Sequence, residues 1–396
     1  MMLKIDSGVS SGIPRVKGSP KPRVSEHPSS VVDGGVLMLG TSPEMRGGVA
    51  AVVAVLRDSG LFEYARVRYV VTHVDGGRWR KLGTFVGATF QVVRVLLTGE
   101  VSVVHAHVSA NGSFWRKAFL LWVARRFRVA TIFHLHDGNF ERYAARGFGG
   151  GLLRRCIRHT LQASDVVIVL SERSARWMQQ FSPRSRVRVI GNPVRLPAHQ
   201  RGVGDRRQAG EAVGQILFLG MICEAKGSFD LLKAFAAFRS RVSGWRLIVG
   251  GNGEVDRFLL QAEHLGVRAD IDFLGWISGT DKERTLSSAD IFVLPSYTEG
   301  MPVSLLEAMA YGSAVVATPV GGVPDMMTPD RHGLWIEPGN IDDLAATLER
   351  LAGSPELRAS LGAAARRHVL TNYSAETAMA KILVAYSEAL LGARAD

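Results

Sequence analysis

Cysteine is scarce in this sequence of 396 residues, where Cys156 and Cys223 stand far apart and outside any CxxC spacing. This pattern argues against a disulfide framework or a cysteine-based zinc site and favours a reducing compartment. The sequence also lacks an apolar run that could cross a membrane. The best candidate, residues 82–98, is short and is interrupted by Gln91 and Arg94.

Acidic residues are scarce in the first half of the chain. Residues 1–200 hold 29 Lys and Arg against 12 Asp and Glu, a net charge of +17, whereas residues 201–396 carry a net charge of −5. Residues 1–33 are rich in Ser, Pro, Gly and basic side chains and lack the apolar core of a signal peptide. We therefore expect a disordered N-terminal tail.

The excess of positive charge predicts an anionic partner, either a membrane surface or nucleic acid. The basic stretch RWRK at residues 78–81 directly precedes the apolar residues 82–98. One interpretation is a helix that lies on an anionic bilayer, and the other is a helix packed within its own domain. Nucleic acid is not expected, because the basic residues lack an interleaved aromatic platform.

Short apolar runs bounded by turn residues alternate with helical patterns along the chain, as a parallel sheet covered on both faces requires. The expected strands are 34–40, 65–74, 101–109, 129–137, 165–171, 186–194, 215–220, 245–253, 271–276, 290–296, 313–322 and 333–338. The pattern predicts two successive doubly wound α/β domains, with the active site in the cleft between them, at the carboxyl ends of the strands.

The domain boundaries follow from breaks in this pattern. We expect an N-terminal Rossmann-like domain over residues 34–200, an interdomain linker over 201–214 and a C-terminal Rossmann-like domain over 215–370. Residues 371–396 are expected to form a helix that starts at Ser374 and packs back on the first domain.

The stretch YTEGMPVSLLEAMAYG, residues 297–312, follows an expected strand and contains a helix that begins at Pro302. The first amides of such a helix are free and its dipole is positive at the same end, so this end can bind a phosphate group. Glycine at position 300 lets the phosphate approach closely. The residues expected at this anion site are Gly300, Met301, Pro302 and Val303.

Glu299 and Glu307 stand on either side of this expected phosphate site. Glu307 lies about five residues into the helix, roughly 7–8 Å along its axis, where it could reach a ribose. Carboxylates accept hydrogen bonds from hydroxyl groups but are poor partners for phosphate. We therefore expect Glu307 to hold a ribose and Glu299 a transferred sugar. A hydrolytic pair is not expected, because such carboxylates flank one bond at about 5–9.5 Å.

Two further stretches carry weaker signals. Lys226 and Gly227 come just before an expected helix, where a lysine can place a point charge on a phosphate but is often only solvated. Gly47 and Gly48 precede a helix at the end of the first expected strand, and glycine pairs at such turns are often purely conformational.

Together these stretches resemble the retaining glycosyltransferases of family 4, also called group 1, which have the GT-B fold. The resemblance spans roughly residues 35–390 and is most specific in the motifs LGMICEAKGSFDLLKAF, VGGNGE, DIFVLPSYTEGMPVSLLEAMAYGSAVVATPVGGVPDMM and HGLWIEPGN. It implies an α/β fold of two facing Rossmann-like domains, with a C-terminal helix that crosses back to the first domain. It also implies a nucleotide-sugar donor bound mainly by the second domain.

The resemblance implies roles for individual residues. Glu299 matches the glutamate that meets the donor sugar, and Glu307 matches the one that binds the ribose. Lys226 matches the diphosphate-binding lysine, and Gly48 with its neighbour Gly47 matches the loop that closes over the diphosphate.

One position departs from the family pattern. Members usually carry an arginine where this chain has Met221, and that arginine joins the lysine on the diphosphate. Either another cation replaces it, or the charge of the departing group is neutralised less completely.

Four histidines stand near the ends of two expected strands of the first domain. His136 matches a family histidine close to the anomeric carbon, and the resemblance implies that His136, Glu299 and Lys226 are the catalytic residues. His134 is expected to point to the opposite face of its strand, and His105 and His107 are expected to serve packing or acceptor contact. A metal site is not expected, because of strand alternation and the lack of cysteine partners.

The resemblance implies retaining, metal-independent transfer of a sugar from a UDP- or GDP-sugar, which is the substrate, with no further cofactor. The charge pattern and the habit of the family favour a lipid-linked or oligosaccharide acceptor of bacterial surface polysaccharide synthesis. We therefore expect a cytoplasmic protein that binds the inner face of the plasma membrane peripherally. Two alternatives remain: a nucleotide-sugar epimerase, which would need no acceptor, and a catalytically silent nucleotide-binding subunit, which Met221 makes conceivable.

Overall fold

The structure is a computed structural model that describes residues 34–45, 47–146, 150–197 and 213–393. The expected tail over residues 1–33 and most of the expected linker over 201–214 lie outside the described residues. Both described halves belong to one structural unit. None of the helices within these described ranges is long and apolar enough to cross a bilayer.

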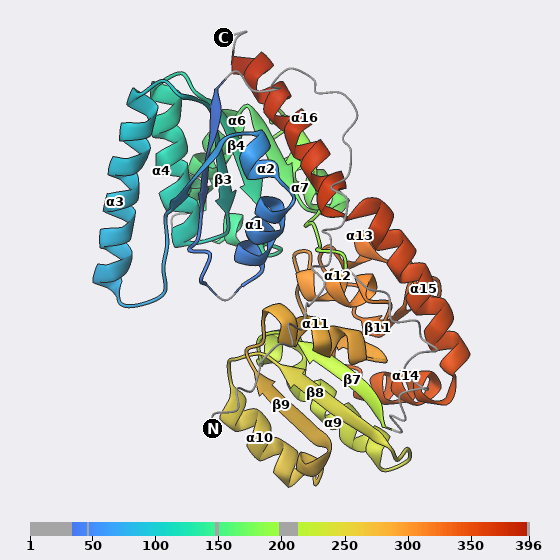
Figure 1. The fold of residues 1–396 in the computed structure, drawn as a ribbon. Coiled ribbons are helices and arrows are strands. Elements are labelled where there is room, and N and C mark those ends of the chain that lie inside the picture. Colours follow the sequence, from blue (N-terminus) through green and yellow to red (C-terminus); the bar gives the residue numbers. More distant parts are fainter. Residues whose placement is uncertain (1–33, 46, 147–149, 198–212, 394–396) are drawn as a thin grey trace, which may run out of the picture. The chain divides into compact units, whose positions relative to one another are not determined.

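The first half contains a parallel sheet with the strand order β2-β1-β3-β4-β5-β6 (Figure 1). Its strands are β1 (Gly35–Gly40), β2 (Val67–Val71), β3 (Val101–Val108), β4 (Ala130–Leu135), β5 (Val166–Val169) and β6 (Val187–Val189). Its helices are α1 (Gly48–Asp58), α2 (Leu61–Tyr64), α3 (Arg78–Leu97), α4 (Gly112–Arg126), α5 (Phe140–Ala144), α6 (Gly150–Gln162) and α7 (Glu172–Phe181).

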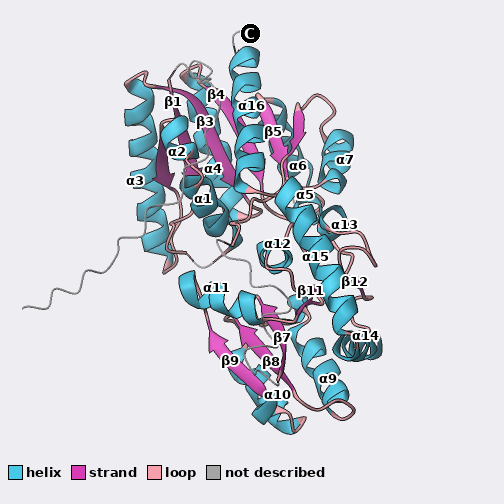
Figure 2. Cartoon of the chain, turned by 45° about the vertical axis from the view of Figure 1, so that its right-hand side comes forward, coloured by secondary structure: helices cyan, strands magenta, loops and turns pink. Residues whose placement is uncertain are grey.

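The second half repeats the architecture, with the strand order β12-β11-β10-β7-β8-β9 (Figure 2). Its strands are β7 (Gly214–Leu219), β8 (Trp245–Gly250), β9 (Ile271–Gly275), β10 (Ile291–Leu294), β11 (Ala314–Ala317) and β12 (Leu334–Trp335). Its helices are η1 (Glu224–Lys226), α9 (Ser228–Arg239), α10 (Val255–His264), η2 (Arg268–Asp270), α11 (Gly279–Ser288), α12 (Val303–Ala310), α13 (Val323–Met326), α14 (Ile341–Gly353), α15 (Pro355–Asn372) and α16 (Ala375–Ala393).

Each expected strand has a counterpart in the structure, so the predicted α/β fold is confirmed. The apolar runs are continuous because helices cover both faces of each sheet. In β1, Leu37 and Leu39 face one core with α3 and α4, whereas Val36 and Met38 face the other core with α1 and α16. One strand therefore contributes to both layers of the first half.

The order of strands reverses at one point in each sheet, and such a reversal opens a crevice at the carboxyl ends of the strands. In the first sheet the reversal lies between β1 and β3, and in the second between β7 and β10. The segments that follow β1, β7 and β10 carry all but one of the predicted site residues, and His136 follows β4, the neighbour of β3. The topology therefore brings the predicted residues to the place where doubly wound folds bind ligands.

Helix α16 packs back on the first sheet, as expected from the sequence (Figure 1). Ser374 caps it by accepting a hydrogen bond from Thr377 N at 3.1 Å. Its buried face joins the core of the first half through Ile382, Ala385, Tyr386 and Ala389. The Tyr386 hydroxyl is 2.9 Å from His105 Nδ1, so the last helix is tied to the interior of β3.

We predict that Tyr386→Ala lowers the free energy of unfolding by about 3–5 kcal/mol, because it empties a fully buried site. Tyr386→Phe keeps the ring and should cost only about 1–2 kcal/mol. Chemical denaturation would measure both values. Leu391→Ala on the same helix is the control, since Leu391 is 69% exposed and should change little. Equal effects of Tyr386→Ala and Leu391→Ala would contradict the prediction.

Candidate active site

A cavity of about 460 Å³ lies at the carboxyl ends of both sheets and is lined by residues of both halves. All ten residues that the sequence predicted for the site line this cavity. They are Gly47, Gly48, His136, Lys226, Glu299, Gly300, Met301, Pro302, Val303 and Glu307. The structure thus brings together residues that are up to 260 positions apart in the sequence.

The amino end of α12 forms one wall of the cavity. Pro302, expected as the first helical residue, is instead the N-cap, with an extended ψ of 116°, and the helix begins at Val303. Proline brings no N–H to this end, so the free amides are those of the residues around it. The N-terminal turn contains no acidic residue. This end of the helix therefore remains suited to an anion.

Close backbone packing fixes the segment before α12. The amide of Gly322 donates to the carbonyl oxygen of Gly300 at 2.8 Å. A methyl group at Gly138 would come within 2.1 Å of the carbonyl oxygen of Glu299, so only glycine fits there. Asn192 Nδ2 donates to the carbonyl oxygen of Met301 at 2.8 Å. These contacts set the direction of the amides before any ligand arrives.

Asn192 was not predicted from the sequence, although it also lines the cavity. Its partner Met301 is 109 positions away, and no local motif marks the contact. Met301 itself has a buried side chain, 5% exposed. Met301 can therefore contribute its backbone to the site, whereas its thioether is packed in the interior.

Glu299 and Lys226 form an ion pair at the cavity wall. Lys226 Nζ lies 2.7 Å from Glu299 Oε1, and the Ser296 hydroxyl donates to the same oxygen at 2.7 Å. The Glu299 side chain is 5% exposed, whereas that of Lys226 is 30% exposed. The carboxylate is thus held in place, and the ammonium group reaches the cavity.

Glu307 has a lysine partner of its own. Lys282 Nζ, from α11, donates to Glu307 Oε1 at 2.7 Å. Burial raises the pKa of Glu307, and the charge of Lys282 opposes that rise. Lys282 was not predicted, because it lies in a polar stretch without a motif. Each of the two predicted glutamates therefore faces the cavity beside a lysine.

Met221 lines the same cavity and is 56% exposed. Among the described residues that line the cavity, the lysines and arginines are Lys226 and Lys282. Lys282 is therefore a second cation on the wall of the cavity that Met221 also lines.

The four histidines at the ends of β3 and β4 form one column of rings. His105 Nε2 lies 3.0 Å from His134 Nδ1, and His107 Nδ1 lies 2.7 Å from His136 Nε2. The rings of His134 and His136 stack with their centroids 4.2 Å apart. The expectation that His134 points to the opposite face is therefore wrong, because residues two apart on a strand share a face.

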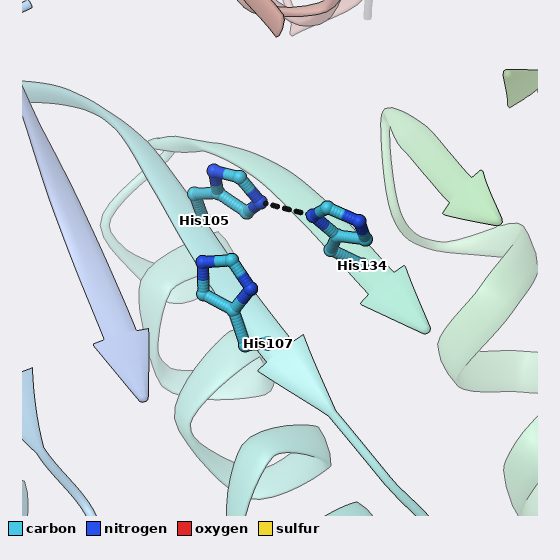
Figure 3. Close-up of side chains that lie close together, drawn as sticks. All are labelled: His105, His107 and His134. Atoms are coloured by element: carbon cyan, nitrogen blue, oxygen red, sulfur yellow. Dashed lines mark hydrogen bonds between the residues drawn. The ribbon is translucent and has the colours of Figure 1, made fainter. Parts of the chain in front are cut away.

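Three of these histidines, His105, His107 and His134, bring ring nitrogens within 4.8 Å of one another (Figure 3). A metal ion requires that the nitrogen lone pairs, which lie in the ring planes, converge on one point. Here the ring planes are inclined by only 13° to 32° to one another. His105 Nε2 and His134 Nδ1 already face each other across a hydrogen bond of 3.0 Å, so a shared metal ion would have to displace that bond. A metal site was not expected from the sequence, partly because strand alternation was expected to separate these side chains. That reason was wrong, because the rings lie on the same face of the sheet.

Burial keeps the histidine column uncharged. It lowers the pKa of His136 to about 3, although a hydrogen bond with Asn192 acts in the opposite direction. It also lowers the pKa of His105 to about 3. His136 is thus a neutral hydrogen-bonding group at the cavity and not a cation near pH 7.

We predict that stability falls steeply as the pH drops below about 6.5, the ordinary histidine pKa. The unfolded chain then takes up protons that the buried rings bind only near pH 3, at a cost of up to about 1.4 kcal/mol per pH unit for each ring. Denaturation midpoints between pH 7.5 and 5 would measure this slope. His105→Asn should make the slope shallower by about one proton.

His264→Asn is the control, because His264 lies exposed at the end of α10. It should leave the slope unchanged. A slope that stays the same in His105→Asn would contradict a neutral buried column.

The comparisons with known proteins agree with this geometry. Residues 45–196 match the model of Glycosyltransferase Family 4, and residues 206–368 match the model of Glycosyl transferases group 1. The D-inositol 3-phosphate glycosyltransferase of Mycobacterium tuberculosis is 28% identical over 332 residues, which are 78% of this chain and 66% of that protein. An uncharacterized glycosyltransferase of Methanocaldococcus jannaschii is 28% identical over 54% of this chain and 57% of its own length. The chain thus spans less than two thirds of these curated relatives.

Solved structures share the fold. Sucrose-phosphate synthase from Thermosynechococcus elongatus aligns with a TM-score of 0.74 at 18% identity, over 89% of this chain and 98% of that chain. HepE from Anabaena, solved in complex with UDP-glucose, aligns with a TM-score of 0.67 at 20% identity, over 89% and 99% of the two chains. With its two parallel sheets and its matches to both family models, the chain belongs to the group 1, family 4 glycosyltransferases of the GT-B fold.

Proposed function

We propose that the protein transfers a sugar from a nucleoside-diphosphate sugar, a UDP- or GDP-sugar, to a hydroxyl group of an acceptor. One observation carries the proposal: a single cavity joins the amino end of α12, Lys226 and the two glutamates. These are the groups that a diphosphate and two sugar rings require. The structure of HepE with UDP-glucose supports a donor of this class.

The donor would lie with its diphosphate between the α12 amides and Lys226. The loop at Gly47 and Gly48, across the cavity, would close over it. Glu307 would hold the ribose and Glu299 the sugar to be transferred, since both carboxylates accept hydrogen bonds from hydroxyls. To reach the diphosphate, the Lys226 ammonium has to share its contact with Glu299, 2.7 Å away.

In the reaction, the bond between the anomeric carbon and the diphosphate oxygen breaks, and its electron pair leaves with the diphosphate. The acceptor oxygen attacks the same face of the sugar, which retains the anomeric configuration. Its proton passes to the departing phosphate oxygen. Lys226 and the helix end stabilise the charge that develops on the diphosphate, and such stabilisation is usually the largest contribution to catalysis. We propose that this charge compensation makes the transfer independent of a metal ion.

The first half carries an exposed apolar surface on helices α3 and α4, which pack side by side (Figures 1 and 2). On each helix the exposed residues recur at helical spacing and so form a stripe. This α3–α4 face consists of Trp79, Leu82, Val86, Phe90 and Leu97 on α3 and Trp115, Phe119 and Trp122 on α4. Trp79 is 78% exposed and Phe90 is 73% exposed.

The charge of the same two helices is of one sign. Their sequences contain no Asp or Glu, whereas basic residues accompany the apolar stripe. The exposed or half-buried basic residues are Arg78, Arg80, Lys81, Arg94, Arg116, Arg125 and Arg126, whereas Lys117 is buried. An apolar stripe edged by cations complements an anionic bilayer surface. The expectation that the basic residues lack interleaved aromatic rings is wrong for the α3–α4 face.

We therefore propose that the protein binds the cytoplasmic face of the plasma membrane peripherally through the α3–α4 face. Its acceptor would be a lipid-linked saccharide of bacterial surface polysaccharide synthesis. The name of one relative, D-inositol 3-phosphate glycosyltransferase, supports an anionic acceptor.

We predict that UDP- or GDP-sugars raise the melting temperature of the protein, because a ligand that binds only the folded state stabilises it. Glu307→Ala should weaken this donor about tenfold, since it removes the hydrogen bonds to ribose. Lys226→Met should lower kcat by about 100-fold or more. Lys233→Met on α9 is the matched control, because Lys233 is exposed and pairs with Asp230. Full donor affinity in Glu307→Ala would contradict the ribose assignment, and sugar interconversion without an acceptor would favour an epimerase.

We predict that the protein sediments with vesicles that contain phosphatidylglycerol, and less with vesicles of phosphatidylcholine alone. The double variant Trp79→Ser, Phe90→Ser should reduce this binding at least about tenfold, because it removes the two most exposed rings of the face. Salt should weaken the binding as well.

The control for this experiment is Leu260→Ser, which removes an apolar side chain, 54% exposed, from α10 in the second half. Equal binding by the double variant would contradict the membrane proposal. Tight binding of an oligonucleotide that depends on the same residues would replace it with a nucleic-acid surface.

A further inference from the structure

Lys117, on α4, is a buried lysine without a carboxylate partner among the described residues. It is 1% exposed, and its Nζ donates to the neutral hydroxyl of Ser113 at 3.2 Å. Burial, followed by the charge of Arg116, lowers the pKa of Lys117 to about 7. A charge so placed is costly unless a counter-ion accompanies it.

Arg116 adds a second cation at the same place. A methyl group on Gly112, the first residue of α4, would come within 3.1 Å of Arg116 Nη1, so the guanidinium folds back over the amino end of the helix. Its Nε is buried and has no hydrogen-bond partner. The Lys117 side chain also extends toward the amino end of α4, since its hydrogen-bond partner Ser113 lies in the first turn of that helix. Two cations thus converge on the positive end of a helix dipole, where each repels the others.

His73, which follows β2, lies close enough to Arg116 and Lys117 for their charges to act on its ring. Its Nδ1 is buried without a hydrogen-bond partner. Burial lowers its pKa, and the charges of Arg116, Lys117 and Lys81 lower it further, against one carboxylate, Asp75. Donors from three elements are therefore gathered here with little negative charge to balance them.

This cluster lies beside the donor cavity. The amide of Ala110, just before α4, donates to Asp137 Oδ2 at 2.9 Å. Asp137 directly follows His136, which lines the cavity. The α3–α4 face begins at the same end of the helix, with Trp115. The amino end of α4 is therefore tied to the segment that carries His136, and the charge of Lys117 acts on the His136 ring.

We propose that Lys117, Arg116 and His73, at the amino end of α4, bind a phosphate or diphosphate group of the acceptor. An anion there removes the mutual repulsion of the cations, satisfies the unpaired nitrogens and accepts from the α4 amides. The inference rests on the proposed transfer to an acceptor. It adds that the acceptor carries a phosphate close to the hydroxyl-bearing sugar that approaches His136.

The test measures the binding of inorganic pyrophosphate to the full chain by calorimetry, in a Lys226→Met background that removes the proposed donor contact. We expect Lys117→Met to weaken this binding at least about tenfold. In the absence of anions the same substitution should raise Tm, because it removes a buried charge and keeps the volume. A purely structural lysine would instead lower Tm when lost. Arg116→Met should weaken binding too, and Lys233→Met is the control.

A second arm uses farnesyl diphosphate in detergent micelles in place of pyrophosphate. A loss confined to pyrophosphate would indicate a free phosphorylated acceptor, and a loss confined to farnesyl diphosphate would indicate a lipid-linked one. No loss with either probe in Lys117→Met would overturn the proposed anion site. Binding of UDP to the Lys117→Met protein is measured separately. A protein that does not bind UDP would contradict the donor proposal, whatever the result with pyrophosphate.

Discussion

The hydrogen-bonded, close-packed backbone before α12 is the constraint on which the rest of the site depends. The Gly300 carbonyl accepts from Gly322, the Glu299 carbonyl lies against Gly138, and Asn192 holds the Met301 carbonyl. Donors that are oriented before charge develops need no reorganisation during reaction. The loops that carry Lys226, Gly47 and Gly48 therefore surround an anion site whose amides are already oriented.

The distribution of charge around the cavity follows from what each group loses on burial. The histidine column becomes neutral, because desolvation outweighs the hydrogen bonds it makes. Lys226 and Lys282 keep carboxylate partners and remain in contact with the cavity. Among the described residues that line the cavity, positive charge is thereby confined to two paired lysine side chains and one helix end, while the neutral His136 ring supplies a hydrogen-bonding group.

The fold and the helix-end part of the site could be predicted because their signals are local. Apolar runs between turn residues marked the strands, and the stretch after one of them marked the amino end of α12. Lys226, the Gly47–Gly48 pair and His136 were instead assigned through the family resemblance, because their local signals are weak. Lys282 and Asn192 escaped prediction because their partners Glu307 and Met301 lie 25 and 109 positions away. The face of His134 was misjudged although the period of a strand determines it. The α3–α4 face could not be predicted from the sequence. An apolar stripe at helical spacing can face the core or the solvent, and only the exposed fractions of its side chains distinguish the two.

The ion pair between Lys226 and Glu299 has a consequence for selectivity. Without a donor, each group neutralises the other, and a lone phosphate must compete with the carboxylate for the ammonium. A lone sugar must likewise compete with the ammonium for the carboxylate. A molecule that offers both a phosphate and a hydroxyl compensates both partners at once. In the proposed donor complex, the pair would therefore favour a molecule that joins a sugar to a phosphate over a lone sugar or a lone phosphate.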